Sequence, residues 1–341
     1  MSKILIVDLS PIGYRWINSA TKTAIKDLNI QKGEDGLYDF NEYKDIFIFK
    51  TLEHIALFKR KFQVDEIVLA IDSSPYWRLD YWDGYKYGRN TNDKSGINWI
   101  DAKASQREVI ALLKEHSSFK VIDVKGAEGD DVGFVLTKEL TAQGHEVIVK
   151  SLDHDWIYNL ENPNTKYWET KHTVKDKECG WVAFNENDIN TLKYEHCMFG
   201  DRGDYLLPVT YYSRFSDLFK EKYPKKTPLE VYPMRHKVDV LFKEKFGKSA
   251  YKQPPLGAIS FYKKQVKEGF STQEFLDRDP IYQMNYDLNK KLGLPDGIPT
   301  EIREKIIAEY NVSSDVKNNK ALTDYFMGYG LIELIAHLPT L

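Results

Sequence analysis

The hydrophobic positions in the first half of the chain follow two different periods. Four short, largely apolar runs rich in β-branched residues are typical of parallel strands that are buried on both faces. Between these runs, apolar side chains recur three and four positions apart, which is the spacing of an amphipathic helix. The predicted strands are residues 3–7, 66–71, 120–124 and 146–149, and the predicted helices are residues 42–62, 99–115 and 130–142. This alternation predicts an α/β fold with a central, mostly parallel sheet flanked by helices.

The character of the chain changes near residue 205. Beyond it Lys, Tyr and Pro become frequent, helical patterns dominate, and residues 220–252 hold ten Lys or Arg against four Asp or Glu. We therefore expect two domains, residues 1–204 and a smaller helical one over residues 205–341, although the second could also pack onto the sheet as one body. The basic stretch is a candidate for gripping a nucleic-acid duplex, or equally a solvated helix face.

Composition narrows the class of protein. The chain has 341 residues, of which 42% are hydrophobic and 29% charged, as in ordinary soluble globular proteins. It has no apolar run long enough for a membrane span and no secretory signal pattern at its start. The two cysteines, Cys179 and Cys197, exclude a disulfide scaffold and a Cys-rich zinc site and favour the cytoplasm. The net charge of −3 by itself argues mildly against nucleic-acid binding.

Carboxylates follow each predicted strand in turn. Ligands of open α/β sheets bind beyond the carboxyl ends of the strands, so these acids should meet at one edge of the sheet. Glu128 and Asp131 are three residues apart at a predicted helix start, so they could share a helix face, and Asp201 and Asp204 have the same spacing. The acids at these positions are Asp8, Asp72, Glu128, Asp130, Asp131, Asp153, Asp155, Asp201 and Asp204.

So many carboxylates at one edge would repel one another. Two of them about 4 Å apart cost roughly 4 kcal/mol at an effective dielectric constant of 20, so cations are expected among them. Oxygen ligands favour Mg²⁺, with Mn²⁺ as a substitute, and two such ions suit phosphodiester hydrolysis. A single Asp after a strand is more often a helix cap or turn residue. The recurrence after four strands is what favours a metal site, whereas His154, inside one of these motifs, is expected to be incidental.

Residues 76–89, YWRLDYWDGYKYGR, combine aromatic rings with cations just after the second predicted strand. Arg78, Lys86 and Arg89 are candidates for contacting phosphates, and rings such as that of Tyr85 could stack on unpaired bases. The alternative interpretation is a helix that packs its aromatic face on the sheet.

Six blocks in this order and spacing resemble one family, the flap endonuclease family of 5′ nucleases, and within it the T-even phage RNase H type. The resemblance continues through residues 294–310 and 325–335 and so covers nearly the whole chain. The blocks are IVD at 6–8, AID at 70–72, YWR…YKYGR at 76–89, AEGDD at 127–131, SLDHD at 151–155 and GDRGD at 200–204.

The resemblance implies a PIN-like 5′-nuclease domain with a helical arch over residues 76–99 and a helical DNA-binding domain. It implies that Lys86 and Arg89 hold the scissile phosphate and that Tyr85 stacks on the terminal base, while Arg78 is expected to contact nucleic acid from its place in the same stretch. It also implies two metal clusters, with Asp8, Asp72, Glu128, Asp131 and Asp155 acting in catalysis. The buried cluster is Asp8, Asp72, Glu128, Asp130 and Asp131, and the second is Asp153, Asp155, Asp201 and Asp204.

The implied activity is that of a Mg²⁺-dependent 5′ to 3′ exonuclease and flap endonuclease that acts on RNA·DNA hybrids and on branched or duplex DNA and removes primers during replication. The expected partners are a single-strand binding protein or sliding clamp, and the expected state is a monomer. If the chain is phage-encoded, the expected compartment is the cytoplasm of the host cell. One departure is that GDRGD is followed by YLLPVTYYSRF, without the Gly-rich helix-hairpin-helix of cellular members. Three alternatives remain: a PIN-type endoribonuclease, a non-catalytic branched-DNA binding protein of the same fold, and a metal-dependent phosphatase.

Overall fold

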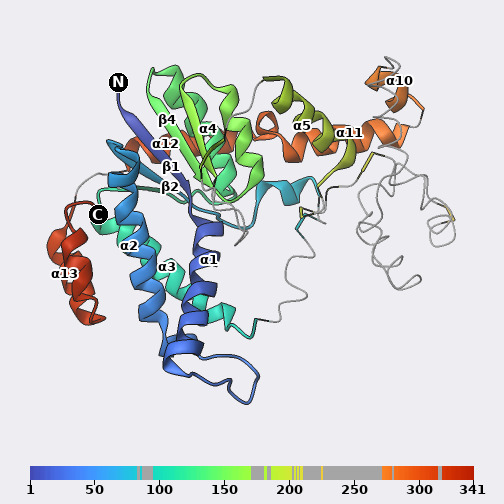
Figure 1. Cartoon of the computed structure of the whole chain (residues 1–341). Helices are drawn as coiled ribbons and strands as arrows, with labels where there is room; N and C mark the ends of the chain where they lie inside the picture. The colour runs from blue at the N-terminus through green and yellow to red at the C-terminus, as the bar shows by residue number, and fades with distance from the viewer. Residues whose placement is uncertain are drawn as a thin grey trace. The chain divides into compact units, whose positions relative to one another are not determined.

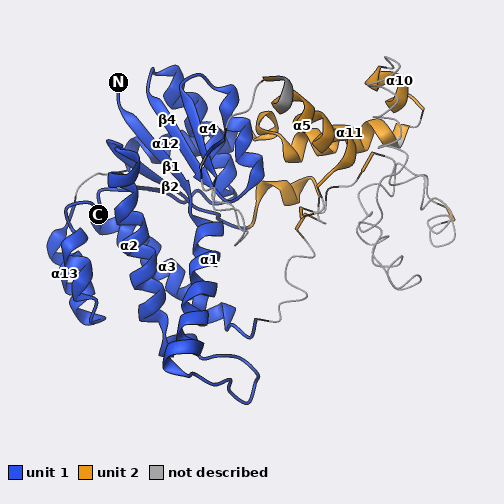
Figure 2. Ribbon diagram, in the orientation of Figure 1, with its two compact units in different colours: residues 1–74, 93–184, 300–341 blue, residues 75–92, 185–299 orange. Residues whose placement is uncertain are grey.

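The structure is a computed structural model of the whole chain. Its described residues form two compact units, shown in Figure 2: unit 1 holds residues 1–74, 93–184 and 300–341, and unit 2 holds residues 75–92 and 185–299. The structure describes residues 1–82, 85–86, 95–169, 180–182, 186–201, 203–204, 206, 208–209, 224–225, 271–278, 280–313 and 317–341.

Unit 1 is built on a six-stranded sheet in the order β3-β2-β1-β4-β5-β6. Every neighbouring pair is parallel except β5 and β6, which are antiparallel. This confirms the predicted mostly parallel α/β fold and its first four strands. The strands β5 and β6 were not predicted from the sequence. The strands are β1 Lys3–Asp8, β2 Glu66–Ala70, β3 Lys120–Ile122, β4 Glu146–Ser151, β5 Thr165–Glu169 and β6 Gly180–Val182.

Helices cover both faces of this sheet because side chains alternate along each strand. Leu5 and Val7 of β1 belong to one large apolar core with residues of α1, α2, α3 and α13. On the opposite face, α4 packs against β1, β2 and β4, and α12 packs against α4 (Figure 1). The α-helices of unit 1 are α1 Leu9–Thr23, α2 Lys44–Phe62, α3 Trp99–His116, α4 Gly129–Ala142, α12 Thr300–Val312 and α13 Asn319–Gly328. Its shorter turns are Ala24–Leu28, Phe40–Glu42, His154–Glu161 and Ile332–His337.

The division into units does not follow the boundary expected at residue 205. Residues 300–341 belong to unit 1, where Leu322 and Phe326 lie in the same core as β1. The Tyr310 hydroxyl donates a hydrogen bond of 2.6 Å to Glu66 at the start of β2, which ties α12 to the sheet. Residues of the C-terminal segment therefore share the core of unit 1, so this part of the chain packs onto the sheet, as the alternative expectation allowed.

Unit 2 is helical in its described residues. Its helices are α5 Glu186–Phe199, α10 Thr272–Leu276 and α11 Pro280–Gly293, with shorter turns at Trp77–Asp80 and Pro295–Gly297. Two buried amides join the elements, because Asn289 donates to the Cys197 carbonyl at 2.9 Å and Asn285 donates to the Val209 carbonyl at 3.0 Å. The basic stretch 220–252 lies outside the described residues apart from Pro224 and Lys225. No helix in the described part of the chain is long and apolar enough to cross a membrane.

Burial of Cys197 between α5 and α11 predicts a loss of stability at alkaline pH. Desolvation raises the pKa of this thiol to about 11, from 9.0. In the unfolded chain this thiol loses its proton at a lower pH than in the folded protein. Its contribution to the free energy of unfolding is therefore complete below pH 9 and is lost as the pH rises through 11. The difference in urea-unfolding free energy between wild type and Cys197→Ala should shrink by about 1–3 kcal/mol over this range. A difference that stays constant from about pH 8 to about pH 11 would contradict the burial of this thiol.

Candidate metal and nucleic-acid site

Two adjacent strands bring the first acids of unit 1 together. Asp8 ends β1 and is 4% exposed, and Ser151 at the end of β4 donates a 2.6 Å hydrogen bond to Asp8 Oδ2. The same Ser151 hydroxyl accepts the Asp153 backbone N–H at 2.8 Å. One serine hydroxyl at the end of β4 thus makes hydrogen bonds with the Asp8 carboxylate and the Asp153 backbone. This is expected where parallel strands end at the same edge of a sheet.

The N-terminus of α4 supplies the next acids. Glu128 is its N-cap and forms a capping box with Asp131, whose Oδ2 accepts the Glu128 backbone N–H at 2.9 Å. Asp130 Oδ1 accepts the Asp131 backbone N–H at 2.7 Å. Glu128 and Asp131 are 1% and 0% exposed, a rare burial for acids, which the positive end of the helix dipole favours. Glu128 and Asp131 therefore do act as helix-capping residues, and they are buried at the first turn of α4, where Gly129 meets Asp72.

Gly129 shows that these acids converge. Its backbone N–H donates to Asp72 Oδ1 at 2.6 Å. A Cβ atom at this position would lie 3.0 Å from Asp8 Oδ1 and 3.3 Å from Asp72 Oδ1. The carboxylates that follow β1 and β2 therefore both approach the first residue of α4, and only a residue without a side chain leaves the space between them open.

Gly129→Ala should weaken binding of a divalent ion without removing any carboxylate. The added methyl group must displace Asp8 or Asp72, and changes just outside a ligand shell typically cost roughly 10- to 100-fold in metal affinity. Isothermal titration with Mn²⁺ would measure it. Gly328→Ala, where a Cβ has no neighbour within 4 Å, is the matched control and should bind Mn²⁺ as wild type does. Equal affinities in the two variants would contradict a site at this position.

The segment after β4 carries the remaining acids of unit 1. Asp153 Oδ1 accepts the Asp155 backbone N–H at 3.1 Å, and the Asp153 carbonyl accepts the Tyr167 hydroxyl at 2.8 Å. Burial raises the pKa of Tyr167, and the negative charges of Glu169, Asp153, Asp8 and Asp155 raise it further. Asp8, Asp153 and Asp155 therefore lie near enough to Tyr167 for their charges to act on the same side chain.

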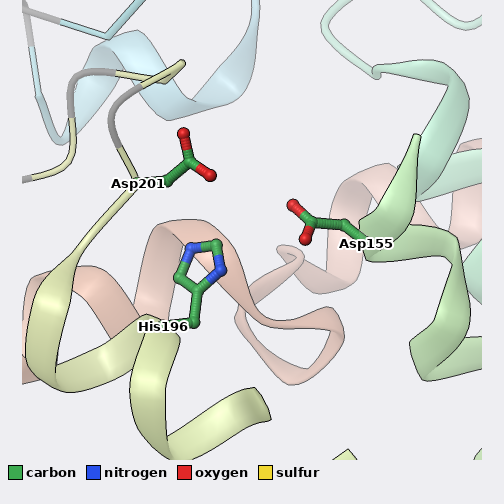
Figure 3. Close-up of side chains that lie close together, drawn as sticks. All are labelled: Asp155, His196 and Asp201. Carbon is green, nitrogen blue, oxygen red and sulfur yellow. The ribbon is translucent and has the colours of Figure 1, made fainter. Parts of the chain in front are cut away.

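Unit 2 carries the acids of the GDRGD motif. Asp201 and Asp204 lie in a turn after α5, where Asp201 Oδ1 accepts the Asp204 backbone N–H at 2.9 Å. His196, near the end of α5, offers a ligand atom within 4.8 Å of a carboxylate oxygen of Asp201. Figure 3 draws these two side chains, together with Asp155 of unit 1. The sequence analysis missed His196. Its place on the last turn of a helix leading into the motif is the signal that could have found it.

The aromatic and basic stretch of unit 2 divides into two parts. Arg78 is 3% exposed, its Nε donates to the Leu292 carbonyl at 2.8 Å, and its guanidinium lies over the Trp77 ring. It therefore supports the stretch from inside rather than facing solvent. Tyr85 and Lys86, by contrast, contact Asp204. Arg89 lies outside the described residues, as do residues 83–84 and 87–94 of the expected arch.

The donor set of unit 1 consists of carboxylate oxygens, the ligands that Mg²⁺ and Mn²⁺ prefer. Asp8, Glu128 and Asp131 are buried, and the Gly129 backbone N–H donates to Asp72 at the same edge of the sheet. The residues present therefore fit a hard divalent cation. In unit 2 the imidazole of His196 beside Asp201 would suit Mn²⁺ or another borderline ion better than Mg²⁺.

Comparison with known proteins identifies the family of this chain. A family model described as 5′–3′ exonuclease, N-terminal resolvase-like domain, matches residues 3–188. Ribonuclease H of Enterobacteria phage T4 is 29% identical over 183 residues, which cover 50% of this chain and 58% of that protein, so the match spans less than two thirds of the relative. A T5 5′-exonuclease structure with bound divalent metal ions (zinc) aligns with a TM-score of 0.54 at 13% identity, over 91% of this chain and 99% of that chain. A second T5 structure, co-crystallised with metal ions, gives the same TM-score and identity over 91% and 98%. At these identities the structural likeness concerns the fold.

Proposed function

Because the chain belongs to the 5′–3′ exonuclease family defined by the N-terminal resolvase-like domain, which makes it a member of a nuclease family, we propose that it is a Mg²⁺-dependent 5′ to 3′ exonuclease and flap endonuclease. One observation carries the proposal: the carboxylates of Asp8 and Asp72 converge on Gly129 at the N-terminus of α4. Such a cluster at the carboxyl edge of a parallel sheet is suited to holding divalent ions against a phosphodiester.

The residues of unit 1 are proposed to hold the ion. Asp8, Asp72, Glu128 and Asp131 would supply its first oxygen ligands, with Asp130 beside them. When bound, such ions lower the pKa of water and stabilise the leaving oxygen of a phosphodiester. Ser151 would keep Asp8 oriented through their 2.6 Å hydrogen bond. The products would be strands with a 5′-phosphate and a 3′-hydroxyl, without a covalent intermediate on the enzyme.

A second set of ligands is proposed from the family resemblance. It comprises Asp153, Asp155, Asp201 and Asp204, to which the proximity of His196 to Asp201 adds a further candidate. Lys86 and Arg89 are proposed to neutralise the charge that develops on the scissile phosphate, and Tyr85 to stack on the terminal base. Because Arg78 is buried, we propose that it supports the stretch that carries Tyr85 and Lys86 and does not contact the nucleic acid itself.

The proposed substrates are RNA·DNA hybrids and branched or duplex DNA, as in primer removal during replication. Ribonuclease H of phage T4 is the relative that supports the hybrid substrate, through a match over 58% of its length. A single-strand binding protein or a sliding clamp is the proposed partner class, and a monomer the proposed state.

The test uses a duplex with a 5′ flap and a matching RNA·DNA hybrid, each labelled at either end and incubated with Mg²⁺ or with EDTA. We expect short 5′ products in Mg²⁺ alone, and the ratio of the two rates ranks the substrates. Tight binding of the flap without cleavage in Mg²⁺ or Mn²⁺ would favour the non-catalytic binding protein. Cleavage scattered along single-stranded RNA would favour a PIN-type endoribonuclease, and phosphate release without strand shortening a phosphatase.

A further inference from the structure

Arg107 of α3 places a cation at the carboxyl edge of the sheet in unit 1. Its Nη2 donates a hydrogen bond of 3.4 Å to the Asp72 carbonyl, and its Nη1 lies 3.1 Å from Asp123 Oδ2. Asp72 comes two residues after the end of β2, and Asp123 directly follows β3, the strand that pairs with β2. One guanidinium thus spans the ends of two neighbouring strands, beside a carboxylate that is proposed to hold the divalent ion.

Asp123 limits the direction in which this guanidinium points. Its side chain is 23% exposed, and its Oδ1 is buried without a hydrogen-bond partner among the described residues. A carboxylate in such a place needs a compensating charge, which the Arg107 guanidinium supplies. The Glu309 carboxylate of α12 accepts the Asp123 backbone N–H at 3.3 Å, and Lys114 of α3 lies 2.6 Å from the same Glu309 oxygen. Asp123 is therefore anchored to α12 through its main chain and to Arg107 through its side chain.

The two contacts of Arg107 leave much of its guanidinium available. An arginine carries five N–H donors, and in the described part of the chain two of them have protein acceptors. The side chain is 53% exposed, so the other donors can reach a group outside the protein. Paired N–H donors of a guanidinium match the geometry of phosphate oxygens. Arg107 is therefore an oriented donor group for a phosphate.

Stability alone gives little reason for a cation in this place. An ion pair with a half-exposed arginine typically contributes at most about 1 kcal/mol. The charge of Arg107 has a clearer consequence for an incoming nucleic acid. Asp8, Asp72, Glu128 and Asp131 are acids of the same edge, and they repel a phosphodiester. A cation beside them lowers the electrostatic barrier that the phosphate meets.

We propose that Arg107 binds a backbone phosphate of the substrate strand next to the metal site, and that Asp123 is the positioning residue that orients it. The inference rests on the proposed function, because it needs a nucleic acid at this edge of unit 1. It adds a phosphate contact from α3 to those proposed for Lys86 and Arg89. The sequence analysis did not select Arg107 or Asp123, which lie inside a predicted helix and a predicted strand.

The test measures how salt weakens binding of the fluorescent 5′ flap duplex in EDTA, where neither cleavage nor a divalent ion contributes. Anisotropy gives the dissociation constant of the full chain between about 50 and 200 mM KCl. Arg107→Gln should bind about tenfold more weakly at the low-salt end. The slope of the logarithm of affinity against that of KCl concentration should become shallower by about 0.7–0.9, the value of one phosphate contact. An unchanged slope would overturn the proposal, because a loss of packing releases no counterion.

Two further variants separate charge from structure. Arg60→Gln removes the same charge from an exposed residue in the last turn of α2, near the start of β2 and so at the opposite edge of the sheet. This control should keep the wild-type affinity and slope. Arg107→Lys keeps the charge without the planar fork and should restore the wild-type slope. A slope that Arg107→Lys does not restore, or that Arg60→Gln lowers equally, would overturn the proposal.

A second measurement uses the wild-type chain and so does not depend on the folding of a variant. Phenylglyoxal modifies exposed arginines, and peptide mass spectrometry follows each of them separately. Saturating flap duplex should slow the modification of Arg107 and leave that of Arg60 unchanged. Equal modification of Arg107 with and without the duplex would overturn the proposal.

The two proposals fail in different ways. A wild-type protein that neither binds nor cleaves the flap duplex would contradict the proposed function, and the inference with it. A wild-type protein that binds and cleaves, with an unchanged salt slope in Arg107→Gln and no protection of Arg107, would contradict the inference alone.

Discussion

Asp8→Asn is expected to lower the rate of Mg²⁺-supported cleavage at least about 100-fold. Losing one charged ligand removes several kcal/mol of stabilisation from the ion and from the charge that it neutralises. The change is nearly isosteric, and the amide oxygen of the new side chain can still accept the hydrogen bond of Ser151, which is 2.6 Å long in wild type. Single-turnover cleavage of the 5′ flap substrate measures the effect.

The same variant should be more stable than wild type when divalent ions are absent, although it cleaves more slowly. Without divalent ions, removing one negative charge relieves repulsion within the acid cluster, so melting in EDTA should move up by roughly 2–4 °C per kcal/mol gained. The stabilisation of wild type by added Mg²⁺ should largely disappear in the variant, because it depends on binding to the folded state. Asp27→Asn, an exposed acid in the turn after α1, is the matched control and should affect neither rate nor melting. An Asp8→Asn enzyme with wild-type rates and a wild-type response to Mg²⁺ would refute the metal site.

Trp156→Ala is expected to have the largest effect on stability, about 3–5 kcal/mol. The Trp156 ring is fully buried, and it packs so closely on α4 that a Cβ at Gly133 would lie 2.6 Å from it. Removing the ring opens a cavity behind the His154–Glu161 turn, which carries Asp155. The urea midpoint should fall with little change in its slope, since the same surface is exposed on unfolding.

Loss of this ring should also weaken Mn²⁺ binding, because Asp153 and Asp155 lose the support that holds their segment. Trp181→Ala is the matched control. Its side chain is 53% exposed on the edge strand β6, so the same truncation there should cost less than about 1 kcal/mol. If the two variants unfold at the same urea concentration, the packing of Trp156 on α4 is not what stabilises this part of unit 1.

The local sequence pattern was sufficient to predict the central strands and to indicate which acids of unit 1 follow them. The strands that end at Asp8 and Ser151 are continuous apolar runs, and a run of this kind is buried wherever it pairs. Because parallel strands end at one edge, the sequence alone could place Asp8, Asp72 and Glu128 near one another. It could not show that Gly129 is the point on which Asp8 and Asp72 converge, because glycine also occurs near helix starts where no side chain approaches it.

Tertiary structure decided what depends on contacts between distant segments. Strands β5 and β6 are short and mixed in polarity, so only their pairing with β4 and with each other makes them strands. Arg78 has the sequence context of a phosphate contact, yet its guanidinium is buried and bonded to Leu292 of α11, a distant segment of the chain. Asp204 belongs to its motif by sequence, and only the tertiary structure shows that its carboxylate contacts Tyr85 and Lys86. The sequence therefore determined which residue types stand at the strand ends, and long-range packing decided which of their atoms meet, because burial and orientation depend on the partner surface as much as on the residue itself.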